Sequence, residues 1–280
     1  MRKVAVVTDS AASLPPDSPP GLYIVPMQLL VDGEDFEDGI GISATEFYRR
    51  LRSRDSVCNT SSPSPSRFLD AFNKASQEAS SILCITVSHT FSSTYDSAKT
   101  AIRSARTALP GVEIELVDSK SAAGGQGLVV TAALRIANTG GSLREVRDSA
   151  ENVADRVSLF AFLDTLYYVW RGGRVPKLAY AGAAILDLKP VLYMKHGNVQ
   201  NVARPRTRRR AKHRMLELME KKIGNSPVHI NVMHGDSVDD AEEIRVAVYN
   251  KFDCKELFVS EFSAVMGVHT GPGLVGVAFW

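Results

Sequence analysis

Cysteine and long apolar runs are both scarce in this 280-residue chain. Its three cysteines, Cys58, Cys84 and Cys254, are odd in number and widely spaced, a pattern that fits neither a disulfide framework nor a Cys/His zinc site. No stretch approaches the roughly 18 apolar residues of a membrane-spanning helix. The first residues reach polar side chains too early for a secretory signal. We therefore expect a soluble, cytoplasmic protein with reduced thiols.

Excess charge and the common catalytic motifs are also missing. The formal net charge is only +2, which argues against a global basic field that recruits nucleic acid or membrane. The sequence contains no G-x-S-x-G elbow, no H-E-x-x-H pair and no P-loop lysine. An enzyme that acts on a small carboxylate or phosphoryl compound remains an alternative, but its nucleophile and base are not visible.

The sequence has the composition and patterning of a globular protein. Hydrophobic residues make up 44% of the chain, and its length is sufficient for two domains. The first half alternates β-rich runs with helical patterns, which indicates βαβ units and a parallel sheet. After about residue 156 the pattern changes to paired strands and separate helices. We predict an α/β fold with a Rossmann-like parallel-sheet domain at 1–156 and an α+β domain at 157–280.

Individual elements follow from local signals. Capping boxes at Ser43 and Ser142 predict helix starts, and Ser64 before Pro65 predicts another. The segment Val25–Gly39 has the Asp-Gly centre of a hairpin. The expected strands are Val4–Thr8, Ile82–Val87, Val112–Val117, Ser158–Leu163, Leu188–Met194, Val199–Arg204 and His229–Met233, followed by two more. The other expected helices are Leu166–Trp170, Arg208–Lys222 and Ala241–Tyr249.

Glycine-rich segments give two ambiguous signals. Residues Gly271–Gly276 spell G-x-G-x-x-G, but a dinucleotide site needs a helix after that turn, and four remaining residues cannot form one. We interpret His269-Thr270 instead as a polar pair on a glycine turn before the last strand. The cluster Gly124–Gly127 could approach a phosphate or allow a helix to pack closely on a sheet, and the sequence leaves both open.

Two hydroxyl clusters and a basic run are the remaining polar features. Thr60–Ser64 and Ser92–Thr94 each open a predicted helix, where hydroxyls and free N–H groups suit an anion. Simple helix capping is the more common role of such serines.

The run Arg204–Arg214 places cations at a helix N-terminus, where the dipole disfavours them. Its partner is a phosphate, an acidic protein surface or nucleic acid, in decreasing order of expectation, unless the run is a solvated helix face.

Several of these segments, in this order, resemble the signatures of the DegV family. Val7–Pro15 resembles T-D-S-x-x-x-L-P, Thr60–Ser64 resembles T-S-Q-P-S with Ser62 for glutamine, and Ser92–Ala98 resembles S-G-T-Y-Q-S-A with Ser93 for glycine. The resemblance continues through Leu163–Tyr168, Gly172-Gly173-Arg174, Leu188–Val191, Arg206-Thr207 and His269–Gly273. It therefore runs from end to end.

The resemblance implies a two-domain fatty-acid-binding protein of the FakB type. Such a protein is not an enzyme and uses no cofactor. It holds a long-chain fatty acid in a buried tunnel between its domains and presents the carboxylate to a fatty acid kinase, whose acyl phosphate feeds phospholipid synthesis. By matching motif, the carboxylate is expected near Thr60, Ser61, Ser92, Ser93, His269 and Thr270.

The same resemblance places Arg174 and Arg206 near the site mouth, where they would contact phosphate or the kinase. The small apolar residues Ala179–Leu186 suit a tunnel wall, although tight helix packing explains them equally well. Two other classes of function stay open as alternatives. One is an enzyme acting at the same hydroxyl cluster. The other is a nucleic-acid-binding module that uses Arg204–Arg214, and the small net charge argues against it.

Overall fold

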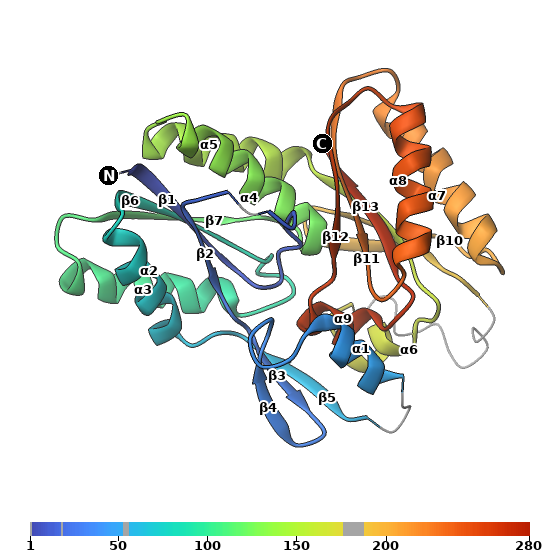
Figure 1. The fold of residues 1–280 in the computed structure, drawn as a ribbon, viewed down its shortest axis with the longest axis horizontal. Coiled ribbons are helices and arrows are strands. Elements are labelled where there is room, and N and C mark those ends of the chain that lie inside the picture. Colours follow the sequence, from blue (N-terminus) through green and yellow to red (C-terminus); the bar gives the residue numbers. More distant parts are fainter. Residues whose placement is uncertain (1, 18, 53–55, 176–187) are drawn as a thin grey trace.

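A computed structural model describes residues 2–17, 19–52, 56–175 and 188–280 of the chain. Its first half contains a parallel sheet with the strand order β2-β1-β6-β7 (Figure 1). These strands are β1 (Arg2–Asp9), β2 (Leu22–Val25), β6 (Ala79–Thr86) and β7 (Glu113–Asp118). The parallel sheet that the sequence predicts is therefore confirmed.

Helices cover both faces of this sheet, which explains its continuous apolar strands. On β1, Ala5 and Val7 pack with α2 (Pro65–Ser76) and α3 (Thr94–Ala108) in one core. The alternate residues, Val4 and Val6, face a second core. That core includes α4 (Ala123–Asn138) and α5 (Leu143–Arg156). The alternation therefore places successive side chains of β1 against helices on opposite faces of the sheet.

The second half is built on a six-stranded mixed sheet with the order β10-β9-β8-β13-β11-β12. Helices α7 (Arg208–Ile223) and α8 (Val238–Lys251) pack on one of its faces. The other face meets α4, so α4 lies between the two sheets. The strands are β8 (Ser158–Phe162), β9 (Val191–Lys195), β10 (Asn198–Ala203), β11 (Val228–His234), β12 (Cys254–Glu261) and β13 (Val275–Phe279).

The glycine cluster at 124–127 serves this packing. Every residue from Ala123 to Leu134 in α4 is buried. A Cβ atom on Gly127 would lie 2.0 Å from the carbonyl oxygen of Ser13, and one on Gly124 would lie 2.6 Å from Met233 Cε. The glycines thus allow α4 to approach both halves, and of the two interpretations left open by the sequence the structure supports close packing.

A third, smaller group of elements borders the two sheets. It contains the sheet β4-β3-β5, made of β3 (Gln28–Val31), β4 (Glu34–Glu37) and β5 (Cys58–Ser61). Three short helices, α1 (Ala44–Leu51), α6 (Tyr167–Gly172) and α9 (Ala264–Thr270), gather beside it (Figure 1). Strand β5 and helix α9 come from opposite ends of the chain, and they meet here.

Three local predictions need correction. Val25 ends β2 in the parallel sheet, so the hairpin is shorter than predicted and comprises β3 and β4 around Asp32-Gly33. His269 and Thr270 form the last turn of α9, which the sequence reading missed, and the glycine turn starts only at Gly271. Ser43 does cap α1, but Glu46 binds Arg49 and Arg50 instead of completing the box. The complete capping box at Ser142 is confirmed.

A buried carboxylate links strands of the first sheet to α4. Asp9 is fully buried and accepts hydrogen bonds from the backbone N–H groups of Ala11 (3.0 Å) and Val87 (2.8 Å) and from Gln126 Nε2 (3.1 Å). It thereby joins β1, the end of β6 and α4. Burial without a cation raises the pKa of Asp9 from 3.8 to about 6. Folding therefore favours the protonated form of this group.

This pKa shift predicts a pH effect. Because the folded-state pKa of Asp9 is raised, protonation between about pH 6 and pH 4 stabilises the folded protein. Asp9→Asn removes that titration. The unfolding free energy of the native protein minus that of the variant is expected to increase by about 2 kcal/mol when the pH falls from 7 to 4.5. Urea denaturation of both proteins at the two pH values measures it, and a constant difference would contradict the assignment.

Candidate functional site: a cavity between the two sheets

A cavity of about 380 Å³ lies where the two sheets and the small group of elements meet. This volume falls in the range of sites for small organic ligands. Most of its lining is apolar and comes from both halves of the chain: Ala11, Met27, Val87, Phe91, Ala122, Ala123, Leu159, Ala161, Leu163, Val169, Val175, Leu192, Met194, Val199, Phe262, Val265, Met266 and Leu274. The polar lining consists of Thr60, Ser61, Ser62, Ser92, Ser93, Arg174, His269 and Thr270.

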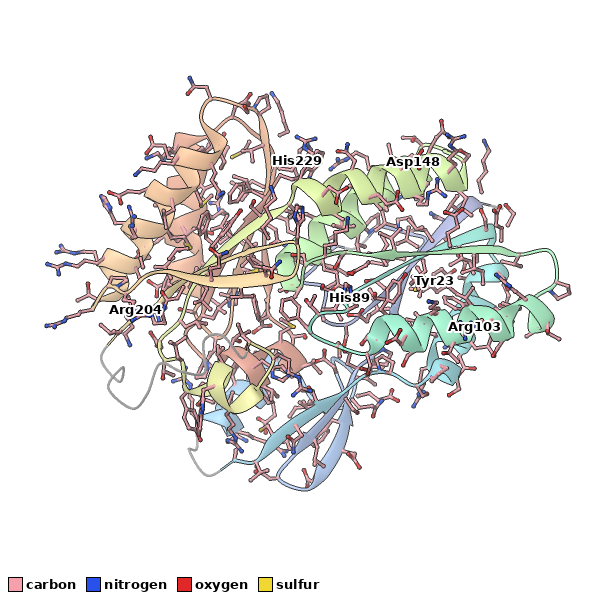
Figure 2. The ribbon with its side chains drawn as sticks, turned by 180° about the vertical axis from the view of Figure 1, so that it is seen from behind. Tyr23, His89, Arg103, Asp148, Arg204 and His229 are labelled. Carbon is pink, nitrogen blue, oxygen red and sulfur yellow. The ribbon has the colours of Figure 1, made fainter. Side chains whose placement is uncertain are left out.

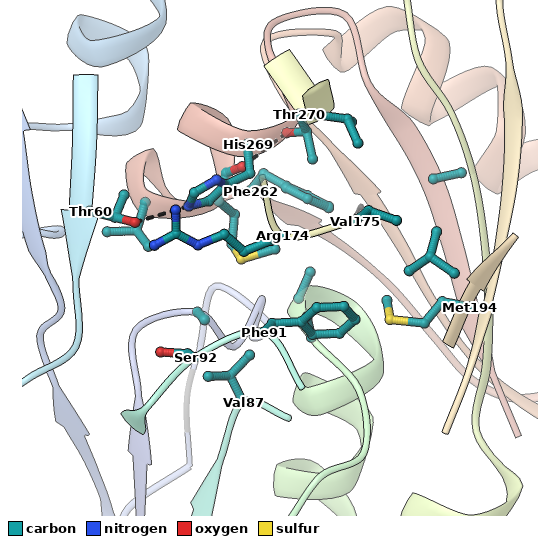
Figure 3. Close-up of a pocket in the computed structure, with 18 of the residues that line it drawn as sticks. Thr60, Val87, Phe91, Ser92, Arg174, Val175, Met194, Phe262, His269 and Thr270 are labelled. Atoms are coloured by element: carbon teal, nitrogen blue, oxygen red, sulfur yellow. Dashed lines mark hydrogen bonds between the residues drawn. The ribbon is translucent and has the colours of Figure 1, made fainter. Parts of the chain in front are cut away.

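The polar side chains gather at one end of this cavity. In Figure 3, Thr60, His269 and Ser92 lie on one side of the view, and Met194 lies on the other. The hydroxyl Oγ1 of Thr60 is 2.9 Å from Nε2 of His269. These residues are 209 positions apart in the chain, so this hydrogen bond joins β5 to α9 directly across the polar end.

The imidazole of His269 is uncharged at neutral pH. Burial, and secondarily the positive charge of Arg174, lower the pKa of His269 from 6.5 to about 4. Its Nδ1 atom is buried and has no hydrogen-bond partner among the described residues. A Cβ atom on Gly172 would lie 2.5 Å from that nitrogen, so the end of α6 packs directly against the ring. A neutral imidazole offers one donor and one acceptor.

A second group of hydroxyls lies between two helix starts. Ser62 Oγ lies 2.9 Å from both Ser92 Oγ and Ser93 Oγ, and Ser92 Oγ lies 2.8 Å from Thr94 Oγ1. Ser64 and Ser93 precede α2 and α3, but neither side chain makes a capping bond to its helix. Simple capping therefore does not account for these two serines.

The structure brings the predicted site residues together. Thr60, Ser61, Ser92, Ser93, His269 and Thr270 all line the one cavity, and so does Arg174. Their contact with a ligand carboxylate stays a prediction. The hydroxyl of Thr270 donates to the carbonyl oxygen of Met266 at 3.0 Å, so its hydrogen is engaged within α9.

Sequence reasoning did not single out Ser62 or the apolar wall residues such as Phe91, Met194 and Phe262. Ser62 lies within the hydroxyl cluster Thr60–Ser64, and this position is a signal that the sequence does offer. The wall residues carried none, because an apolar side chain that faces a cavity has the same periodicity as one that faces the core. The segment Ala179–Leu186, expected as a tunnel wall, lies outside the described residues.

The basic run divides into two sets. Arg208, Lys212 and Arg214 pair with carboxylates of the same half of the chain. Arg204, Arg206, Arg209 and Arg210 are exposed and form no ion pair with the described residues. Arg204 lies after β10 on the outer side of the molecule (Figure 2). Arg206, expected at the site mouth, does not line the cavity.

Arg208 also has a structural role near the site. Its guanidinium binds Asp164 at 2.6 Å and the carbonyl oxygen of Gly273 at 2.8 Å, and it pairs with Asp240. It also stacks over Phe162, with 5.0 Å between its central carbon and the ring centre. Arg208 thus fixes the glycine turn that follows His269.

Comparison with known proteins agrees with this architecture. The model of the DegV family, described as uncharacterised proteins, matches residues 3–280. The chain belongs to the DegV family. A DegV domain-containing protein of Clostridium perfringens is 31% identical over 100% of this chain and 98% of its own length. A Streptomyces coelicolor relative is 32% identical over 99% and 98%.

Two solved structures share the fold. A DegV family protein from Thermus thermophilus, described by its fatty acid binding, superposes with a TM-score of 0.90 at 29% identity and covers 100% of this chain and 99% of its own. A stearic-acid-binding protein from Eubacterium ventriosum gives a TM-score of 0.88 at 26% identity, with 100% and 98% covered. The predicted fold class is thus confirmed by relatives as well as by topology.

The lowered pKa of His269 predicts a pH effect opposite to that of Asp9. Because the folded state resists protonation of this ring, stability is lost as the pH falls from about 6.5 through about 4. His269→Gln removes the titration. The unfolding free energy of the native protein minus that of the variant is expected to decrease by about 2 kcal/mol between pH 7 and pH 4.5. Urea denaturation of both proteins at the two pH values measures this difference. If the difference is the same at both pH values, the pKa of His269 is not lowered by folding.

Proposed function

We propose that this protein binds a long-chain fatty acid in the cavity, with the carboxylate at the Thr60–His269 end and the alkyl tail along the apolar walls. The observation that carries the proposal is the uneven lining of the cavity. Hydroxyls and one imidazole are gathered at one end, and apolar side chains make up nearly all of the rest. The fatty acids described for the Thermus thermophilus and Eubacterium ventriosum relatives support this ligand class.

The chemistry of the polar end suits a carboxylate. A buried anion is tolerated only where several donors face it. When Nε2 of the neutral imidazole donates to Thr60 Oγ1, the Thr60 hydrogen is free to donate to the ligand. This arrangement also leaves Nδ1 as an unpartnered acceptor instead of an unpartnered N–H. Ser92 supplies a second hydroxyl, and the backbone N–H groups near Ser61 and Ser93 supply further donors.

The two parts of the cavity contribute differently to binding. Each buried methylene of the tail contributes about 0.8 kcal/mol, so the apolar walls supply most of the affinity. The polar end fixes the direction in which the acid enters and holds its carboxylate at the rim beside Arg174. A ligand bound in this way presents its headgroup, and not its tail, to a partner.

Extraction of bound ligand tests the function. Purified native protein is expected to release about one equivalent of a long-chain fatty acid, identified by mass spectrometry. A delipidated protein that takes up no fatty acid would refute the proposal.

Thr60→Val keeps the volume but removes the hydroxyl, and we expect about tenfold weaker binding of the acid. Thr100→Val, on the outer side of α3, is the control.

We propose further that a fatty acid kinase uses the loaded protein as its substrate, in the cytoplasm. Transfer of the ATP γ-phosphoryl group to a carboxylate oxygen gives an acyl phosphate and ADP, and the acyl phosphate feeds phospholipid synthesis. In this scheme the protein is a carrier and not an enzyme. The exposed Arg174 beside the cavity and the exposed Arg206 would contact the kinase or its nucleotide phosphates.

This carrier role predicts separable effects. Arg174→Ala and Arg206→Ala are expected to retain bound fatty acid but to lower its phosphorylation by an added fatty acid kinase at least tenfold. Arg103→Ala is the matched control, because Arg103 is an exposed arginine on α3 (Figure 2) that is not one of the cavity-lining residues. Unchanged phosphorylation in both variants would show that these arginines do not contact the kinase. The proposal that the protein binds a fatty acid would not be affected.

A further inference from the structure

Four hydroxyl groups form an unbranched chain at the polar end of the cavity. Ser62 Oγ contacts Ser93 Oγ and Ser92 Oγ, both at 2.9 Å. Ser92 Oγ in turn contacts Thr94 Oγ1 at 2.8 Å. The order is therefore Ser93, Ser62, Ser92, Thr94. Ser62 follows β5, whereas the other three stand at the start of α3, so Ser62 connects two separate segments beside the Thr60–His269 pair.

The number of hydrogens in this chain restricts how it can bond. Each hydroxyl carries one hydrogen and has two lone pairs. Three contacts among four hydroxyls use three hydrogens, so one hydroxyl keeps a hydrogen that can be donated elsewhere. All three hydrogen bonds must then point toward that hydroxyl. The location of the free hydrogen therefore sets the direction of every bond in the chain.

A carboxylate accepts hydrogen bonds and donates none, so the hydroxyl that faces it must carry the free hydrogen. The proposed function assigns that contact to Ser92. When the free hydrogen is on Ser92, both Ser62 and Thr94 donate to Ser92 Oγ, and Ser93 donates to Ser62. Donation from two neighbours polarises the Ser92 hydroxyl and makes it a stronger donor.

We propose that Ser62 is a positioning residue for the fatty-acid carboxylate and acts through Ser92. The inference rests on the proposed function, since it needs an anionic headgroup at this end of the cavity. Ser62 lines the cavity, but its hydrogen is committed to Ser92 when the acid is bound. Its effect is thus specific to ligands that need Ser92 as a donor.

The test compares two ligands of equal length on delipidated full-length protein. Hexadecanoic acid is an anion, whereas hexadecan-1-ol has a hydroxyl that either donates or accepts. Ser62→Ala is expected to weaken binding of the acid about fivefold and to change binding of the alcohol less than twofold. Ser62→Thr keeps the hydroxyl and is expected to restore the affinity for the acid. Displacement of a fluorescent fatty acid measures both ligands.

Ser66→Ala is the matched control. Ser66 Oγ lies 2.8 Å from Ser64 Oγ, so this variant removes one hydroxyl and its hydrogen bond to a second, and neither residue lines the cavity. It is expected to leave both affinities unchanged. Equal losses for acid and alcohol in Ser62→Ala, or no loss for the acid, would overturn the role of Ser62. Native protein that binds neither ligand would overturn the proposed function itself.

Discussion

The position of α4 between two sheets is the constraint on which the rest of the structure depends. A helix with its side chains is about 10 Å wide, and it holds the sheets apart where it is present. The cavity is lined by Ala122 and Ala123 at the start of α4, and its walls continue from strands of the second sheet. The glycines at 124, 125 and 127 bring the helix close to both halves.

The cavity combines an apolar interior with a polar end that carries little charge of its own. His269 is neutral, the nearby groups are hydroxyls, and Arg174 stands exposed beside them. Such an end can receive an anion without first separating an existing ion pair, which would cost binding energy. The hydroxyl chain around Ser92 adds one donor, whose location changes as the hydrogens reorient without any movement of the heavy atoms.

The arginine run shows how one sequence feature can serve two purposes. The macrodipole makes cations at the start of α7 unfavourable, and carboxylates offset that cost at Arg208 and Lys212. Arg208 then braces the turn after His269 through Gly273. The other set, Arg204, Arg206, Arg209 and Arg210, is exposed and forms no ion pair within the described part of the chain. A count of charges in the run could not separate these sets, because pairing depends on α8 and on Asp164.

The sequence by itself determined the alternation of strands and helices, the parallel sheet and the motifs that identify the family, because these depend on local periodicity and on short contiguous segments. It could not show that Val25 belongs to a sheet strand or that His269 ends a helix, since neither has a distinct local pattern. Only the tertiary structure decided that Thr60 and His269 meet, and that Ser62 bonds to Ser92. Contacts between residues 209 and 30 positions apart arise from packing around α4, and no local pattern encodes them.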